Sequence, residues 1–301
     1  MRIDKTRGLV AAPPTGFTGD GKIDLSAVGS LAAHLATQGV VGGFVNGTTG
    51  EGMSLTIKER EAIAEEWRRT IPAQFKLFVH VGHNCIEDAR RLARHAQKIG
   101  ADAIACIAPD FFKPTVPEGL VDWCAAIVAA APNMPFYFYH MPSKSGVDLR
   151  IAPFIRLAAE RIPNFAGVKF TFEALDDYLE CLRLDKGRYD LLWGRDEMLL
   201  SALAAGARGG VGSTYNIAAP LYLRIIEAFE SGDLCQAREL QARSVELIGE
   251  MKKFGDIFSV IKAILHSQGV PISPRVRAPL GSLTPEQAEA AGRRCLEIIE
   301  K

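Results

Sequence analysis

The sequence predicts an α/β protein, a (β/α)8 TIM barrel that carries a C-terminal helical extension. Two observations support this prediction. Short apolar runs alternate with amphipathic helical patterns eight times along the chain, and no glycine-rich dinucleotide fingerprint follows the first run. Eight such units form either a closed barrel or a large open sheet, and the regular repeat favours the barrel. The 301 residues suit a barrel with an extension, since a barrel alone takes about 250 residues.

The eight apolar runs are the expected strands. They are nearly continuous in apolar residues, which is typical of parallel strands buried on both faces. They cover residues 9–13, 42–47, 76–82, 103–109, 135–142, 165–171, 189–194 and 209–216.

Sequence signals mark the ends of the helices between the strands. Two pairs have the spacing of a capping box and predict helix starts: Thr56 with Glu59, and Thr115 with Glu118. Three glycines that follow an apolar stripe and precede a strand predict helix ends: Gly39, Gly100 and Gly206.

The last part of the chain has only helical patterns. Helices are expected near residues 218–231, 233–253, 257–268 and 284–300, and one of them serves as the eighth barrel helix. We therefore expect residues 1–231 to form the barrel and residues 232–301 to form a helical extension packed on it. No Ser-, Gly- or Pro-rich linker separates the two.

Composition limits the function classes. The 35 basic and 35 acidic residues cancel, so there is no general attraction to nucleic acid or to an anionic membrane. No apolar stretch approaches the roughly 18 residues of a membrane span, and the first residues lack a signal-type apolar segment. The six cysteines form no CxxC pair. These features predict a cytoplasmic protein.

Lys169 is the most informative residue at the strand ends, which meet in one pocket in a barrel. Its neighbours in the sequence are apolar, and desolvation lowers the pKa of an amine. A neutral amine can attack a ketone and form a Schiff base. A lone lysine is far more often a capping or ion-paired residue, but the polar strand ends around this one favour catalysis.

Tyr139 is the expected proton carrier, because a positioned phenol can relay protons during imine chemistry. Strand alternation puts Tyr137 on the same face as Tyr139, so one of the two can be a packing residue only.

Other strand ends offer groups for a substrate. Thr48 and Thr49 lie in a glycine-flanked loop, GTTG, whose hydroxyl and amide groups suit a carboxylate. Asp196 and Glu197 can accept hydrogen bonds from sugar hydroxyls, although acids are also common at helix starts.

No metal or cofactor is expected. His80 and His83 lie on or just after a strand, but no third ligand stands at a convincing spacing. Packing or hydrogen-bonding roles are therefore favoured for both.

Five motifs in this order, GTTGE, YHMP, GVKFT, GRDE and GVGSTYN, resemble the N-acetylneuraminate lyase and dihydrodipicolinate synthase superfamily over essentially the whole chain. The resemblance implies a metal-free TIM-barrel aldolase that forms a Schiff base with pyruvate and is usually a homotetramer. Within the superfamily, the stretch PFYFYHMP with His140 is similar to the animal-type sialic acid lyases.

The resemblance also implies residue roles. Lys169 forms the imine, Tyr139 transfers protons, and Thr48 and Thr49 hold the carboxylate. The remaining site residues are expected to line the pocket for the sugar chain: Thr171, Gly194, Asp196, Glu197, Gly212 and Ser213, with Phe258 nearby. The implied reaction is reversible cleavage of N-acetylneuraminate, a 2-keto sugar acid, to N-acetylmannosamine and pyruvate.

Two departures keep alternatives open. Lys144 stands where sialic acid lyases usually carry an apolar residue and where the synthases carry a carboxylate-binding arginine. The stretch PDFF at 109–112 lacks the tyrosine that synthases contribute across a subunit interface. The alternatives are a sibling pyruvate-dependent aldolase or dihydrodipicolinate synthase acting on another 2-keto acid, and a catalytically silent sugar-acid binder.

Overall fold

In the computed structural model, which describes residues 3–301, eight parallel strands close into a barrel in the order β1-β10-β9-β8-β7-β6-β5-β4. The strands are Gly8–Ala11 (β1), Gly42–Val45 (β4), Lys76–His80 (β5), Ala103–Ile107 (β6), Phe136–His140 (β7), Phe165–Phe170 (β8), Asp190–Trp193 (β9) and Gly209–Gly212 (β10). Each predicted apolar run overlaps one strand, so the TIM-barrel prediction is confirmed. A small antiparallel hairpin, Gly16–Phe17 (β2) and Ile23–Asp24 (β3), follows the first barrel strand.

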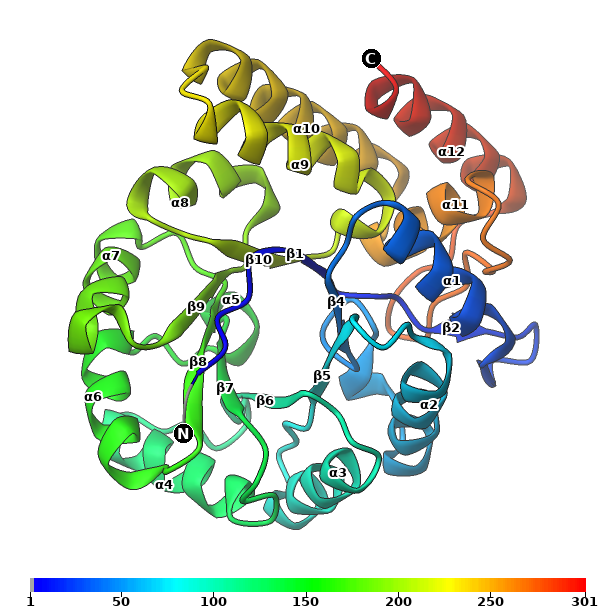
Figure 1. Ribbon diagram of the computed structural model, residues 1–301. Helices are drawn as coiled ribbons and strands as arrows, with labels where there is room; N and C mark the ends of the chain where they lie inside the picture. Colours follow the sequence, from blue (N-terminus) through cyan, green and yellow to red (C-terminus); the bar gives the residue numbers. More distant parts are fainter. Residues whose placement is uncertain (1–2) are drawn as a thin grey trace.

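Helices form a ring around the barrel in Figure 1. The ring contains Ser26–Thr37 (α1), Ile57–Thr70 (α2), Ile86–Lys98 (α3), Pro117–Val128 (α4), Ile151–Arg161 (α6), Leu175–Arg183 (α7), Leu199–Ala205 (α8) and Tyr215–Glu230 (α9). Short helical turns lie in the loops at Gly52–Ser54 (η1), Pro142–Ser145 (α5), Leu184–Gly187 (η2) and Asp196–Met198 (η3). The helix that follows the eighth barrel strand is α9, as one of the C-terminal helices was expected to be.

Three further helices lie outside the ring on the side of α9 (Figure 1). They are Leu234–Phe254 (α10), Ile257–Ser267 (α11) and Pro285–Ile299 (α12). The predicted helical extension is therefore present, and its boundary between residues 231 and 232 stays a prediction. No helix within residues 3–301 is both long and apolar enough to cross a membrane.

Side chains of the barrel strands alternate between two apolar clusters. In β7, Phe136 and Phe138 pack outward between strands and helices, whereas Tyr137 and Tyr139 belong to the cluster inside the barrel. This inner cluster also contains Phe44 and Phe78, and all four of its aromatic residues are buried. The alternation thus decides which strand residues can reach the centre of the barrel.

The predicted helix ends are confirmed with one exception. The capping box of Thr56 and Glu59 has both of its hydrogen bonds. Thr115 does not cap a helix: α4 begins at Pro117, and Val116 precedes it with extended φ and ψ of −135° and 151°. The prediction failed because proline forces the residue before it out of the helical region, so Val116 cannot be a first helical residue. The three helix-end glycines have φ of 81°, 73° and 110° at positions 39, 100 and 206.

Helix α9 begins earlier than the residue 218 that the sequence suggested. It starts at Tyr215, and a break at Ala218, with φ and ψ of −141° and 28°, separates the first turn from the rest. Pro220 lies just beyond this break and lacks an amide hydrogen, so the first turn cannot continue regularly into the helix.

Candidate active site

Two adjoining hollows lie at the carboxyl ends of the barrel strands. The Tyr139 hollow, of about 260 Å³, is lined by three of the expected residues: Thr48, Tyr139 and Phe258. The Asp196 hollow, of about 540 Å³, is lined by five: Thr171, Gly194, Asp196, Glu197 and Ser213. Lys144 lines both hollows. The structure thus brings most of the expected site residues to one end of the barrel.

Lys169 stands inside the barrel on β8 and is only 4% exposed. Its Nζ lies 4.2 Å from the centre of the Phe44 ring and 4.0 Å from that of Tyr139. Burial lowers the pKa of Lys169 to about 7, although the Asp196 carboxylate opposes the shift. A substantial fraction of the amine is therefore neutral at neutral pH, as a nucleophile requires.

Tyr139 is the direct neighbour of Lys169, because the register of β7 and β8 pairs the two residues. Its hydroxyl lies 3.1 Å from Thr48 Oγ1 and also contacts the sulfur of Met141. Burial raises the pKa of Tyr139 to about 12, so the phenol is protonated at neutral pH. Tyr137 instead donates to Asp190 Oδ2 at 2.9 Å, nearer the amino end of the strand. Of the two tyrosines, only Tyr139 approaches Lys169.

The loop that follows β4 presents unused backbone donors. Asn46 and Glu51, at its two ends, have left-handed φ of 59° and 54°. Between them, the amides of Thr48 and Thr49 donate to no protein acceptor within residues 3–301. Free amides in such a turn form a nest for an anion, so the loop has the character expected of a carboxylate site.

Asp196 is buried at the start of η3 and is fixed by Thr214. Its Oδ2 accepts hydrogen bonds from the Thr214 amide at 2.8 Å and the Thr214 hydroxyl at 2.6 Å. Burial raises the pKa of Asp196 to about 6. A side chain at Gly212 would bring its Cβ to 2.1 Å from Asp196 Oδ1. Only glycine at position 212 therefore leaves room for this carboxylate.

Thr171, Gly194 and Glu197 complete the wall of the Asp196 hollow. Thr171 Oγ1 is buried without a hydrogen-bond partner in the described part of the chain. A Cβ at Gly194 would lie only 1.9 Å from this oxygen, so the glycine leaves room for the hydroxyl. Glu197 Oε1 accepts a hydrogen bond of 2.9 Å from Arg195, which orients its carboxylate. The free Thr171 hydroxyl is available to a ligand.

Two residues that the sequence did not single out, Phe44 and Met141, shape the site together with His80. Phe44 contacts both Lys169 and Tyr139, and the Met141 sulfur contacts the Tyr139 hydroxyl. His80 packs its ring edge-on against Tyr139, with 5.9 Å between the ring centres. Strand alternation could have placed Phe44 inside the barrel, three residues before the GTTG loop. Met141 follows a strand end, where no periodic signal applies.

His80 has the hydrogen-bonding role that the sequence favoured. Its Nε2 accepts from the Ile107 amide at 3.2 Å, so its Nδ1 carries the proton and donates to the Asn46 carbonyl at 3.1 Å. Burial holds the pKa of His80 well below its ordinary value, and the ring is neutral. Over residues 3–301, no three His, Cys, Asp or Glu side chains gather into a metal-binding group.

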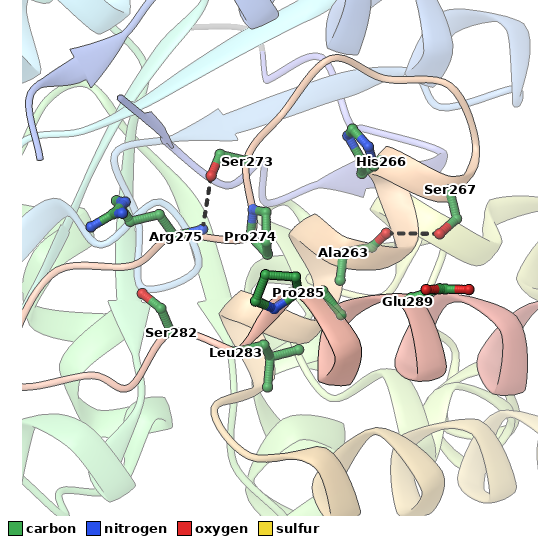
Figure 2. A pocket seen from close by; sticks show the side chains of 11 residues that line it. Ala263, His266, Ser267, Ser273, Pro274, Arg275, Ser282, Leu283, Pro285 and Glu289 are labelled. Atoms are coloured by element: carbon green, nitrogen blue, oxygen red, sulfur yellow. Dashed lines mark hydrogen bonds between the residues drawn. The ribbon is translucent and has the colours of Figure 1, made fainter. Parts of the chain in front are cut away.

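A larger hollow, of about 590 Å³, lies between α11, residues 273–283 and α12 (Figure 2). None of the expected site residues lines it. Its walls come from the helical extension and include Arg275, His266 and Glu289, three charged or titratable side chains that are exposed.

Comparisons with known proteins agree with the geometry. Residues 5–297 match the Dihydrodipicolinate synthetase family. The chain is 43% identical to an N-acetylneuraminate lyase of Mus musculus, covering 94% of this chain and 89% of the mouse protein. It is 41% identical to that of Gallus gallus, covering 98% and 97%. A solved Proteus mirabilis N-acetylneuraminate lyase superposes with a TM-score of 0.94 at 37% identity, covering 98% of this chain and 99% of that one.

The unusual pKa of Lys169 can be measured directly. In an NMR titration of lysine side chains, we expect a signal with a midpoint of about 7 that is missing in Lys169→Met. Asp196→Asn should lower this midpoint further, because the carboxylate stabilises the charged amine. A Lys169 signal that titrates near the ordinary value for lysine would contradict the buried, partly neutral amine.

Proposed function

The chain belongs to the dihydrodipicolinate synthetase family, and we propose that it is a carbon–carbon lyase that cleaves N-acetylneuraminate reversibly to N-acetylmannosamine and pyruvate. The names of the mouse, chicken and Proteus mirabilis relatives support this substrate. The observation that carries the chemistry is the contact between Lys169, whose pKa is about 7, and the protonated phenol of Tyr139.

The first step is imine formation at Lys169. The neutral amine attacks the C2 ketone of the substrate, and the carbinolamine loses water to give a protonated imine. Tyr139 supplies the proton with which the hydroxyl leaves as water. The positive imine then lies beside the resulting phenolate, which stabilises a form that burial alone disfavours.

Carbon–carbon cleavage follows from the imine. The phenolate of Tyr139 takes the proton of the C4 hydroxyl, the C3–C4 bond breaks, and its electron pair moves toward the imine nitrogen. N-acetylmannosamine leaves as the aldehyde, and an enamine of pyruvate remains on Lys169. Protonation at C3 and hydrolysis then release pyruvate and restore the neutral amine. No cofactor takes part in these steps.

The two hollows suit the two ends of the substrate. The GTTG loop, with the free amides of Thr48 and Thr49, holds the carboxylate beside Tyr139. In the Asp196 hollow, Thr171, Asp196, Glu197 and the backbone at Gly194, Gly212 and Ser213 bind the hydroxyl-rich chain. Hydroxyl groups need acceptors far from the imine, and the two carboxylates supply them.

The alternative substrate depends on Lys144. This lysine is exposed and borders both hollows, so a second carboxylate could reach it, as in a synthase. We favour the sugar because Asp196 and Glu197 provide hydroxyl acceptors and because lysine lacks the two-pronged carboxylate grip of arginine. A silent binder is disfavoured, since it has no need of a neutral lysine beside a phenol.

We also propose a homotetramer, as the family resemblance implies, and a cytoplasmic location, which the scattered cysteines favour. The adjacent rings of Phe111 and Phe112 are 76% and 84% exposed and stack edge-on. Paired exposed aromatic rings are typical of surfaces that other subunits cover.

Trapping the imine tests the mechanism. Incubation with pyruvate and borohydride should add one reduced pyruvate to the chain, located on Lys169 by peptide mass mapping. Lys169→Met should remain unmodified. An unmodified wild-type chain, or an adduct on Lys144, would refute the mechanism and revive the silent binder.

Tyr139→Phe tests the proton relay. Turnover of N-acetylneuraminate should fall by about 100-fold or more, the usual scale of general acid–base catalysis, while part of the imine formation is retained. Tyr137→Phe is the matched control, because its hydroxyl bonds Asp190 rather than the site. Near-normal turnover in Tyr139→Phe would assign the relay elsewhere.

A pair of substitutions separates the sugar from a dicarboxylic substrate. Glu197→Ala should raise the free energy of the transition state for N-acetylneuraminate cleavage by roughly 1–3 kcal/mol, the cost of losing a hydrogen bond to a hydroxyl. Lys144→Leu should change kcat/KM little. The reverse pattern, with Lys144 essential and Glu197 dispensable, would mean that another 2-keto acid is the substrate.

A further inference from the structure

Glu51 and Lys262 form a fully buried ion pair that the reaction described above does not use. Both side chains are 0% exposed, and Lys262 Nζ lies 2.6 Å from Glu51 Oε1. The second carboxylate oxygen of Glu51 accepts a hydrogen bond of 2.8 Å from the Arg277 amide. Lys262 also donates to the Arg275 carbonyl at 2.6 Å. Each charge is therefore satisfied by the other and by the backbone.

The pair joins two distant parts of the chain. Glu51 ends the GTTGE loop of the barrel, whereas Lys262 lies on α11 of the helical extension, 211 residues away. Figure 2 shows the segment around Arg275 beside α11, where the carbonyl that accepts from Lys262 is located. The helical extension thus contacts the GTTGE loop through hydrogen-bonded, charged groups.

The loop needs support at both ends because both ends are strained. Asn46 and Glu51 have φ of 59° and 54°, a region that non-glycine residues rarely adopt. At the first end, the Asn46 side chain donates to the Arg60 carbonyl at 2.9 Å within the barrel. At the second end, the Thr15 hydroxyl donates to the Gly50 carbonyl at 2.7 Å, and the loop's own side-chain anchor is the Glu51 ion pair.

Stability alone is a weak reason for such a pair. Burying two charges costs much desolvation energy, and a well-packed apolar pair often stabilises a protein as well or better. What the ion pair adds is a fixed orientation of the Glu51 side chain and backbone. The Glu51 amide donates to the Thr48 carbonyl at 3.0 Å. The Thr48 hydroxyl in turn lies 3.1 Å from the Tyr139 hydroxyl.

We propose that Glu51, held by Lys262 and the Arg277 amide, is a positioning residue for the Thr48–Thr49 carboxylate site, so that the helical extension sets the affinity for the 2-keto acid. This inference rests on the proposed function only in its choice of pyruvate as ligand. Glu51 itself touches no reacting atom.

Three variants test the proposal in the full chain. Glu51→Gln removes one charge, and Glu51→Gln with Lys262→Met removes both, so that no unpaired charge stays buried. The control is Glu59→Gln. This substitution breaks the ion pair between Glu59 and Arg277, a second link between the barrel and the C-terminal segment. A glutamine at position 59 can still close the capping box of α2.

The first readout is how borohydride trapping depends on the concentration of pyruvate. Both Glu51 variants should need about 10-fold more pyruvate for half-maximal labelling, whereas labelling at saturation is retained. Glu59→Gln should keep the wild-type dependence even if its melting temperature falls. Recovery of the wild-type dependence in the double variant, or an equal shift in Glu59→Gln, would overturn the positioning role.

Hydrogen exchange is the second readout and does not depend on the proposed reaction. The amides of Glu51 and Gly52, which bond within the loop to the Thr48 and Gly47 carbonyls at 3.0 Å, should exchange about 10-fold faster in both Glu51 variants. Unchanged exchange in these variants would also overturn the proposal. If the wild-type chain fails to trap pyruvate, the proposed function fails, and the exchange data still decide whether Glu51 positions the loop.

Discussion

The removal of Lys169 from water is the constraint on which the site depends. A lysine amine is charged in water at neutral pH, and only the closed barrel, with the rings of Phe44 and Tyr139 over its Nζ, makes the neutral form accessible. The same burial raises the pKa of Tyr139 to about 12 and that of Asp196 to about 6. One physical cause thus shifts all three groups toward their neutral forms, and for Lys169 the neutral form is the nucleophile that the proposed imine formation needs.

The arrangement of the barrel follows largely from local sequence. Apolar runs and helix-end signals predict the strands, the order of the elements and the location of Lys169 and Tyr139, because strand ends meet on one face and alternation selects the inward residues. The failure at Thr115 is also local, because Pro117 keeps Val116 out of the helix although Thr115 and Glu118 have the spacing of a capping box.

What the sequence could not supply is contact between residues far apart in the chain. Nothing in GTTGE indicates that Glu51 meets Lys262, and nothing near Met141 indicates that its sulfur contacts the Tyr139 hydroxyl. The requirement for glycine at 194 and 212 is equally hidden, because it arises from Thr171 and Asp196 on other strand ends. Periodicity identifies which face a residue occupies, whereas such contacts depend on the closed three-dimensional packing.

The ion pair between Glu51 and Lys262 has a consequence for how the protein matures during synthesis. The ribosome delivers the GTTGE loop early and α11 among the last helices, so the loop exists for most of translation without its anchor. All eight barrel strands precede α11 in the chain, and a nascent barrel can assemble while the Glu51 carboxylate still faces water. The Glu51 anchor can therefore form only after α11 has emerged from the exit tunnel, so the proposed positioning role makes completion of the GTTGE loop a step after barrel closure.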